Sequence, residues 1–144
     1  MRDGLTYPRS VRLYRDAGLI LSILFAIVGA IFLAIPDGVL RFMNDIAELV
    51  GMKPAPASGF SFYLVLAAAY MYVVSLLAYR MFSLPDDDLC PMLLVNAKGA
   101  SAVISIGALL FQGGYFVYAA NAFVDGSIAI GVLILWRSRK GAWR

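Results

Sequence analysis

Four long apolar segments, each as long as a helix that crosses a lipid bilayer, dominate this sequence. They cover about residues 18–36, 60–79, 91–111 and 115–136. A helix rises about 1.5 Å per residue, so about 20 residues cross the roughly 30 Å of hydrocarbon in a bilayer. Backbone polar groups in hydrocarbon must be satisfied within the segment, so we expect each span to be an α-helix. The sequence predicts an all-α membrane protein, with four transmembrane helices in a bundle that forms a single domain over residues 1–144.

The composition supports lipid as the solvent around most of this chain. Hydrophobic residues make up 62% of the 144 residues, and charged residues make up 15%. Soluble domains are closer to about half apolar and about a quarter charged, and a soluble fold of this length cannot hide so much apolar surface. The basic N-terminus leads into a long apolar run without a small-residue cleavage site, so we expect the first span to remain as an anchor.

The basic residues beside the spans predict the orientation. They cluster before the first span and after the fourth, whereas the connection after the first span holds only Arg41 and Lys53. The clustered residues, together with one between the second and third spans, are Arg2, Arg9, Arg12, Arg15, Arg80, Arg137, Arg139, Lys140 and Arg144. Positive residues are retained on the cytoplasmic side. We therefore expect a bacterial inner-membrane protein with both termini in the cytoplasm.

A fifth, amphipathic helix is expected over about residues 38–50. Apolar residues recur there at helical spacing, and polar residues fill the opposite face. The apolar set is Val39, Leu40, Phe42, Met43, Ile46, Leu49 and Val50, and the polar set is Arg41, Asn44, Asp45 and Glu48. Asp37 is the expected N-cap and Gly51 the expected stop, and a proline-containing return follows over residues 53–59. We expect this helix to lie on the outer membrane surface or to cap the bundle.

Small residues predict where the spans approach one another, because lipid gives helices no hydrophobic reason to associate. The small residues at helical spacing are Ser22, Ala26, Ala30 and Ala34 in the first span, Ala97, Ser101 and Ser105 in the third, and Ala122, Gly126, Ser127 and Gly131 in the fourth. These stripes suit contacts within the bundle and contacts between copies of the chain equally. The acidic run Asp86-Asp87-Asp88 precedes the third span, where we expect it to cap the helix.

Two charged residues, Lys98 and Asp125, lie inside apolar spans. A charge near the bilayer centre is energetically expensive, so it usually faces the protein interior. Lys98 lies roughly 10 Å from the cytoplasmic end of its span, a depth from which a lysine can extend its ammonium group to the interface. The short side chain of Asp125 reaches neither interface, so this residue must be neutralised by something within the membrane.

Three arrangements would neutralise or satisfy Asp125. It can pair with Lys98, since antiparallel third and fourth spans place the two residues about one helical turn apart in depth, although both side chains lean toward their own helix N-terminus and so lean apart. It can carry a proton, because burial disfavours the charged form of a carboxyl group. It can also cap a local helix break beside Gly126, with Asn121 one turn earlier. A structural role, proton handling and ligand contact all remain open.

The candidate intramembrane polar site consists of Lys98, Asp125, Asn121 and Asn96. A small pocket for a quinone-like or lipid-like molecule would be lined by Asn96, Asn121, Gln112 and several tyrosines. The sequence has no histidine, which excludes histidine-ligated haem, histidine acid–base catalysis and the usual zinc sites. Its single cysteine, Cys90, excludes a disulfide within the chain. We expect no catalytic residue, no cofactor and no metal ion.

The first span ends at Pro36-Asp37, the surface-helix sequence GVLRFM follows, and three further spans complete the short chain. In this layout the chain resembles the DoxX-like group of small four-helix membrane proteins. The resemblance covers most of the length and concerns layout rather than a distinctive motif. It implies a link to quinone-dependent oxidation systems or a role as an accessory membrane subunit, and it transfers no catalytic residue.

We expect a non-enzymatic accessory or scaffold subunit of a membrane complex, which contacts the lipid bilayer and either a protein partner or a second copy of itself. One alternative is a small proton-coupled transporter or exporter that uses Asp125. Another is a DoxX-like subunit of a quinone-linked oxidoreductase. Contact with anionic lipid and the topology account for the basic termini, so we expect no nucleic-acid partner.

Overall fold

The computed structural model describes residues 7–56 and 61–141, and for residues 61–64 it describes the backbone alone. Its helices are α1 (Arg9–Ala34), α2 (Pro36–Leu49), α3 (Ser61–Ser83), α4 (Leu89–Phe111) and α5 (Phe116–Gly141). All of these except α2 are long and apolar enough to cross a membrane. The expected fold class, four transmembrane helices with one amphipathic helix after the first, is confirmed. Arg2, Arg144 and residues 57–60, which include the end of the proline-containing return, lie outside the described residues.

Two of the helices extend well beyond the spans expected from hydropathy. α1 begins at Arg9 rather than near residue 18, and α5 continues to Gly141 rather than ending near residue 136. Hydropathy marks the part of a helix that lies in hydrocarbon, whereas the helical backbone continues as long as its residues favour it. Arginine, leucine and lysine all do. The basic side chains of both ends are therefore carried on helical turns.

The chain turns sharply between α1 and α2 because of Pro36. A proline disfavours the helical conformation in the residue before it, and Ile35 has φ −139° and ψ 58°. Proline itself fits the first position of a helix, and α2 begins there. Asp37 therefore lies inside the first turn of α2 and makes no side-chain cap hydrogen bond. The prediction of Asp37 as the N-cap is wrong, because the helix begins at Pro36 and Ile35 takes the N-cap position, two residues earlier than expected.

The end of α2 follows the prediction. Gly51 has φ +67°, which glycine adopts without strain. Its amide donates to the Glu48 carbonyl at 3.2 Å, and the Met52 amide donates to the Ala47 carbonyl at 2.8 Å. This pair of hydrogen bonds is the Schellman arrangement that ends a helix at a left-handed residue. Gly51 as the stop of this helix is confirmed.

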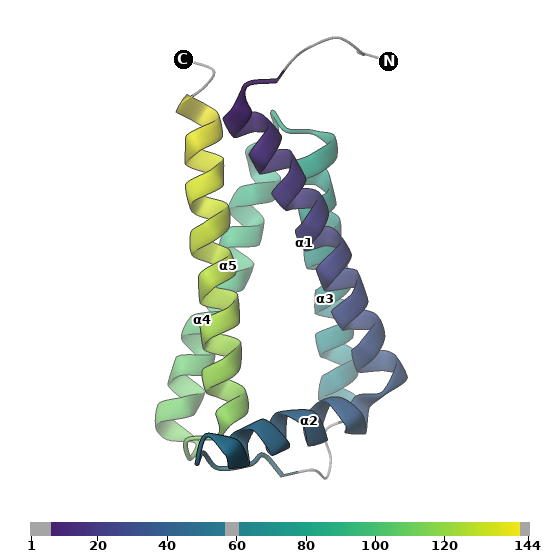
Figure 1. Ribbon diagram of the computed structural model, residues 1–144, viewed down its shortest axis with the longest axis vertical. Helices are drawn as coiled ribbons and strands as arrows, with labels where there is room; N and C mark the ends of the chain where they lie inside the picture. Colours follow the sequence, from purple (N-terminus) through teal and green to yellow (C-terminus); the bar gives the residue numbers. More distant parts are fainter. Residues whose placement is uncertain (1–6, 57–60, 142–144) are drawn as a thin grey trace.

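α2 lies at one end of the bundle, where it contacts α1, α3 and α5 (Figure 1). Only part of its predicted apolar face is covered: Leu40 is buried and Met43 and Ile46 are half-buried, whereas Phe42 and Leu49 are exposed. The described part of the return after α2 is held by hydrogen bonds both to α2 and to the start of α5. The Asn44 side chain exchanges two hydrogen bonds with the Ala55 backbone, at 2.8 and 2.9 Å.

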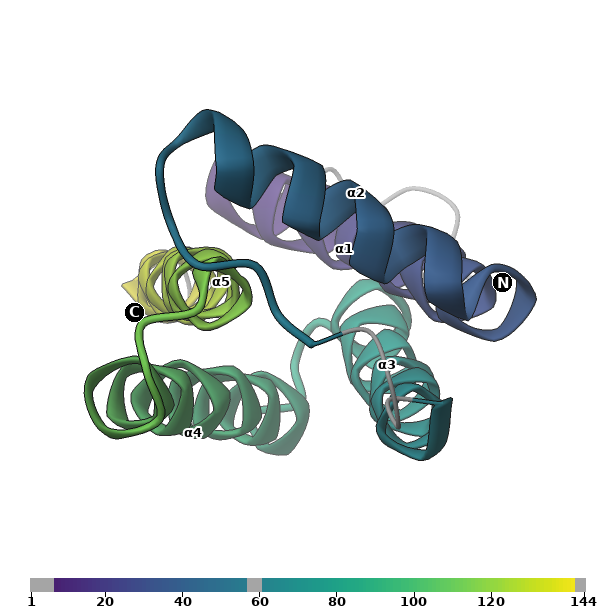
Figure 2. The same cartoon turned by 90° about the horizontal axis from the view of Figure 1, so that it is seen from below.

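The return is also tied to the start of α5. The Phe116 amide donates to the Lys53 carbonyl at 3.2 Å, and the Lys53 ammonium lies 4.8 Å from the centre of the Tyr115 ring. α2 and its return thus form a strut that leads from the end of α1 to the beginning of α5. Seen from that end, α2 lies over α1, and the return passes the end of α5 and crosses the space between the helices (Figure 2).

The four long helices form two pairs, in which α1 packs along α3 and α4 packs along α5. Within the first pair, Gly18 and Gly29 allow the closest approach. A Cβ at Gly18 would lie 2.9 Å from the Ala78 carbonyl oxygen, and one at Gly29 would lie 3.0 Å from the Met71 Cβ. Small residues therefore do bring these helices together, as lipid-embedded helices require.

Three members of the stripe of small residues in the first span lie outside the contacts within the bundle. Ala26, Ala30 and Ala34 are exposed, and only Ser22 faces α3, where the Ser75 Oγ donates to the Ser22 carbonyl at 2.8 Å. The contact face of α1 is instead set by Gly18, Phe25 and Gly29, which repeat at spacings of seven and four residues. Several faces of this helix carry small residues, so spacing alone did not identify the one in contact.

The small residues predicted for the third and fourth spans are more often buried or half-buried within the bundle than those of the first span. Ala97, Ser101 and Ser105 are all at least half-buried, and Gly126 faces α4, where an added Cβ would lie 3.7 Å from the Ala102 Cβ. Ser127 is exposed and lies outside this contact.

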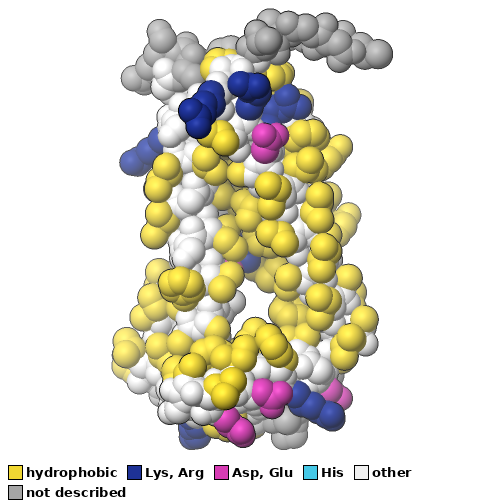
Figure 3. Space-filling model, in the orientation of Figure 1, with side chains coloured by type: hydrophobic (Ala, Val, Ile, Leu, Met, Phe, Trp, Pro, Cys, Tyr) yellow, Lys and Arg dark blue, Asp and Glu magenta, His cyan; other side chains and the backbone are white. Residues whose placement is uncertain are grey.

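The two helix pairs converge at the end where α1 begins and α5 ends, and they diverge toward α2 (Figure 1). The buried apolar core, which includes Tyr14, Val74, Met81, Leu94 and Val132, joins the pairs at the convergent end. Toward α2, the space-filling view shows an opening between the pairs (Figure 3). The bundle is closed at one end by packing and bridged at the other by the strut.

Candidate functional site

The two intramembrane charges form an ion pair. Lys98 Nζ lies 2.8 Å from Asp125 Oδ1, and the two side chains are 1% and 3% exposed. Among the arrangements left open by the sequence, pairing between the third and fourth spans is the one observed. The long lysine side chain bridges the offset that arises because each residue leans toward its own helix N-terminus. Lys98 therefore does not extend to the membrane surface.

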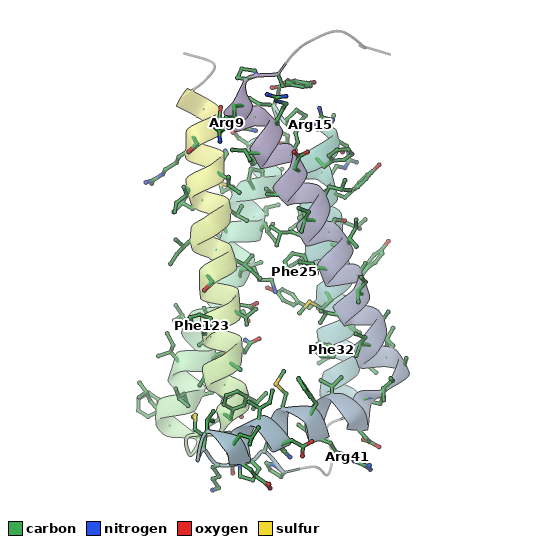
Figure 4. The ribbon with its side chains drawn as sticks, viewed as in Figure 1. Arg9, Arg15, Phe25, Phe32, Arg41 and Phe123 are labelled. Carbon is green, nitrogen blue, oxygen red and sulfur yellow. The ribbon has the colours of Figure 1, made fainter. Side chains whose placement is uncertain are left out.

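Aromatic rings from the other helix pair enclose the lysine. The Lys98 ammonium lies 4.7 Å from the centre of the Phe25 ring on α1 and 4.9 Å from the centre of the Tyr70 ring on α3. Both distances are within the range of cation–π attraction. Figure 4 shows Phe25 reaching from α1 toward the space between the two pairs. The ion pair thus joins all four spanning helices near their middles.

A second polar group lies one turn from Asp125 on the same face of α5. Asn121 Nδ2 donates to Ser101 Oγ at 3.1 Å and to Ser105 Oγ at 2.7 Å. These bonds connect α5 to α4, as the ion pair does. Asn121 therefore belongs to the site, and the two serines, singled out by the sequence only as packing residues, are its partners.

Asn96 and Gln112 do not belong to the site. Asn96 is exposed, and its Nδ2 donates to the Met92 carbonyl of its own helix at 2.8 Å. Gln112 lies at the end of α4, where its Oε1 accepts a hydrogen bond from the Tyr118 hydroxyl at 3.0 Å. The prediction that these residues line a central pocket is wrong, because both side chains are exposed and satisfied close to their own position in the chain.

A shallow, open cavity of about 310 Å³ lies between α3 and α4, and it borders Tyr70, whose ring contacts the Lys98 ammonium of the ion pair. Its walls are formed by Tyr70, Ala97, Ala100, Ser101, Ile104 and Ser105. Two wall residues, Ala100 and Ile104, are exposed on the outer surface of α4. The cavity therefore opens sideways, toward the lipid, at the depth of the charged pair. Its volume is at the lower end of the roughly 300–1,000 Å³ of small-molecule sites.

Two buried polar atoms at this level have no hydrogen-bond partner within residues 7–56 and 61–141: the Tyr70 hydroxyl and the Asp125 Oδ2. Buried polar groups are usually satisfied, and the exceptions call for a physical reason. Tyr70 also forms a wall of the cavity, so one of these atoms belongs to a residue that borders the open space. The centre of the membrane span therefore combines unused hydrogen-bonding capacity with free volume.

A separate charged cluster closes the convergent end of the bundle. Asp88, in the connection before α4, binds Arg139 and Lys140 on α5, with the Lys140 contact at 2.8 Å, and accepts a hydrogen bond from Trp136 Nε1 at 2.7 Å. Arg139 is buried, donates to the backbone carbonyls of Pro85 and Asp87, and lies over the Tyr14 ring of α1. We call Asp88, Trp136, Arg139 and Lys140 the end cluster.

The environment of the acidic run lowers two pKa values. The hydrogen bond from Lys140, followed by that from Trp136, lowers the pKa of Asp88 from its ordinary value of 3.8. The hydrogen bond from the Leu89 amide, followed by that from the Cys90 thiol, lowers the pKa of Asp87. Asp87 thus caps the start of α4, as expected for this run. The bridge from Asp88 to α5 was missed, although antiparallel spans place residues 88, 139 and 140 at the same membrane surface.

Within the part of the chain that the structure describes, no three His, Cys, Asp or Glu side chains lie together as a metal site requires. No family model, curated protein or solved structure matches this chain. The resemblance to DoxX-like proteins therefore remains a prediction from layout.

Proposed function

We propose that this protein is an accessory membrane protein that holds a lipid-like amphipathic molecule in the cavity between α3 and α4. The observation that carries this proposal is the position of the cavity: it opens toward lipid through Ala100 and Ile104 and lies beside the buried polar site. A binding role fits the chemistry of the centre, since Lys98 and Asp125 are engaged with each other rather than presented as a free acid or base.

The test is to identify what accompanies the purified protein. Mild detergent extraction followed by native mass spectrometry should detect an amphiphile bound in a fixed ratio. The change Ala100→Phe fills the mouth of the cavity and should remove that species. Ala69→Phe is the matched control, because Ala69 is also an exposed alanine in a spanning helix but lies outside the cavity wall. Equal retention of the amphiphile by both variants would contradict the proposal.

The accessory role is tested by the same extraction. A tagged copy in a mild detergent should recover a partner protein, or a second copy of the chain, in constant stoichiometry. The exposed alanine face of α1 offers a surface for such a contact, since small residues allow helices to approach closely in lipid. Repeated recovery of the bare monomer would count against an accessory role.

We further propose that the end of the bundle where α1 begins and α5 ends faces the cytoplasm of a bacterial inner membrane. Its support is the clustering of basic residues, such as Arg9 and Arg15, at that end, opposite Arg41 (Figures 3 and 4). In a Cys90→Ser background, a cysteine at Ser138 should react with a membrane-impermeant reagent only after the membrane is opened. A cysteine at Lys53 should react from outside.

The unpartnered Asp125 Oδ2 favours one second candidate, proton-coupled transport. A carboxylate oxygen without a donor is a place at which a proton can bind. Under this alternative, Asp125→Asn should abolish pH-dependent uptake by proteoliposomes while the helical content is unchanged. Uptake that is absent in the unmodified protein as well would remove this candidate.

A further inference from the structure

We propose that the cavity selects an uncharged amphiphile that presents an oxygen acceptor, such as an ester or ketone carbonyl, in preference to an anionic lipid. The proposal rests on the binding role of the cavity given above and specifies its ligand class. It follows from two features of the cavity wall: the direction of its hydrogen bonds and its net charge.

The hydroxyl groups of the wall are arranged as donors. Asn121 Nδ2 donates to both Ser101 Oγ and Ser105 Oγ, so each serine oxygen acts as an acceptor on the side that faces α5. A hydroxyl group has one hydrogen to donate besides its acceptor lone pairs. Each serine therefore keeps its own hydrogen for a partner other than Asn121, and both serines line the cavity.

Tyr70 supplies an aromatic wall rather than a further donor. It forms the α3 side of the cavity wall, while its hydroxyl oxygen is buried and has no hydrogen-bond partner among the described residues. The donors that an occupant can reach are therefore the two serine hydroxyls, which favour acceptor oxygen atoms in the occupant.

The net charge beside the cavity is zero. Lys98 and Asp125 neutralise each other, and the lysine is only 1% exposed, with its ammonium enclosed by the carboxylate and by the Phe25 and Tyr70 rings. The other basic residues of the described chain lie toward the ends of the bundle, as Arg9, Arg15 and Arg41 do in Figure 4. A phosphate or carboxylate in the cavity would lose its hydration without gaining a cation, which is strongly unfavourable in a low dielectric.

The remaining walls suit the apolar part of an amphiphile. Ala97, Ala100 and Ile104 contribute only hydrocarbon, and Ile104 is 70% exposed where the cavity meets the lipid. An acyl or isoprenoid chain can therefore extend past Ile104 into the bilayer while the carbonyl group stays at the serines. The cavity is large enough for such a head and the start of its chain, and not for a whole lipid.

A matched set of probes tests this ligand class. Radiolabelled diacylglycerol is bound to the purified full-length protein in detergent, and phosphatidic acid with the same acyl chains competes for the site. These two lipids differ by one phosphate group. An alkane of the same chain length lacks the acceptor oxygen atoms. We expect diacylglycerol to bind saturably, and both the phosphatidic acid and the alkane to compete at least about tenfold more weakly.

The double change Ser101→Ala and Ser105→Ala should lower the affinity for diacylglycerol about tenfold, because two donors are lost. Ser127→Ala is the matched control, since Ser127 is exposed and does not line the cavity, and it should leave the affinity unchanged. If the double variant fails to fold, the competition experiment on the unmodified protein tests the ligand class by itself.

The outcomes separate this proposal from the function on which it rests. Equal or stronger competition by phosphatidic acid overturns the ligand class but leaves a binding role in place. Competition by the alkane that equals that of unlabelled diacylglycerol overturns the acceptor requirement. If none of the probes binds saturably, both the ligand class and the proposed function are overturned.

Discussion

The protein holds charges together in two places, and these places differ in their access to water. The Lys98–Asp125 pair lies in the middle of the spanning helices with both side chains almost fully buried. In the end cluster, Asp88 is 51% exposed and Lys140 is 47% exposed, and only Arg139 is buried. The same chemical interaction is therefore found once in a dry environment and once at the boundary with water.

This difference explains the roles of the two sites. In the centre, neither charge tolerates the loss of its partner, because the remaining ion would stay uncompensated in a low dielectric. Such a pair specifies which helix faces which, and it leaves no free charge beside the cavity. At the end of the bundle, water can replace a lost partner, so the cluster contributes to packing mainly through its one buried member.

The comparison of the two charged sites predicts the largest loss of stability for single substitutions of Lys98 or Asp125. Lys98→Met or Asp125→Asn should each lower the free energy of unfolding by about 3–5 kcal/mol, because each leaves an unpaired buried charge. The measurement is reversible unfolding in mixed micelles. Lys140→Met is the matched control for Lys98→Met and should cost less than about 1 kcal/mol. Equal losses at the two lysines would show that the two environments do not differ.

Within the end cluster, we expect a smaller difference in lost stability between substitutions of the two adjacent basic residues, Arg139 and Lys140. Arg139→Gln removes a buried donor from the Pro85 and Asp87 carbonyls and should cost about 2 kcal/mol. Lys140→Gln removes a half-exposed ion pair and should cost about 0.2–1 kcal/mol. The same unfolding measurement distinguishes them, and a larger loss at Lys140 would mean that exposure does not control these contributions.

Acid should weaken the end cluster by a still smaller amount. The pKa of Asp88 is lower in the folded protein than its ordinary value of 3.8. The stabilisation is therefore fully present above pH 3.8 and is lost as the pH falls through the lowered folded pKa. Thermal unfolding at about pH 5 and about pH 3 should show a greater decrease for the unmodified protein than for Asp88→Asn. Identical decreases would rule out a contribution from this carboxylate.

Added salt should change stability least, and it should weaken only the ion pair of the end cluster. At about 1 M salt the screening length is about 3 Å, which weakens exposed ion pairs and leaves buried ones largely unscreened. The coupling between Asp88 and Lys140, from a double-mutant cycle, should fall by a few tenths of a kcal/mol. The coupling between Lys98 and Asp125 should not change. Salt sensitivity of the central pair would indicate that water reaches it.

Local rules in the sequence predict the helices and several of their ends. The apolar segments have the length that the bilayer imposes, and the helical spacing of apolar residues identifies α2. Gly51 ends α2 because a left-handed position favours glycine. The positions of Lys98 and Asp125 also mark the centre of the site from sequence alone, since a charge in a span must face the protein.

What the sequence leaves undetermined depends on packing between helices. Several faces of α1 carry small residues, so the sequence does not show that Gly18 and Gly29, rather than the alanine stripe, form the contact with α3. The cavity exists because the helix pairs diverge toward α2, and no residue in α4 signals that divergence. Asn96 and Asn121 are the same residue type in neighbouring spans, and only the rotation of each helix places one in the site and the other outside it.

The central claim is that Lys98 and Asp125 form an ion pair with each other in the membrane interior. The coupling free energy between the two residues tests this claim most directly. It is obtained from the unfolding of the unmodified protein, the two single variants and the double variant Lys98→Met with Asp125→Asn. A closed pair predicts that the double variant recovers most of the stability lost by either single variant, with a coupling of at least about 2 kcal/mol. Strictly additive losses would contradict the account.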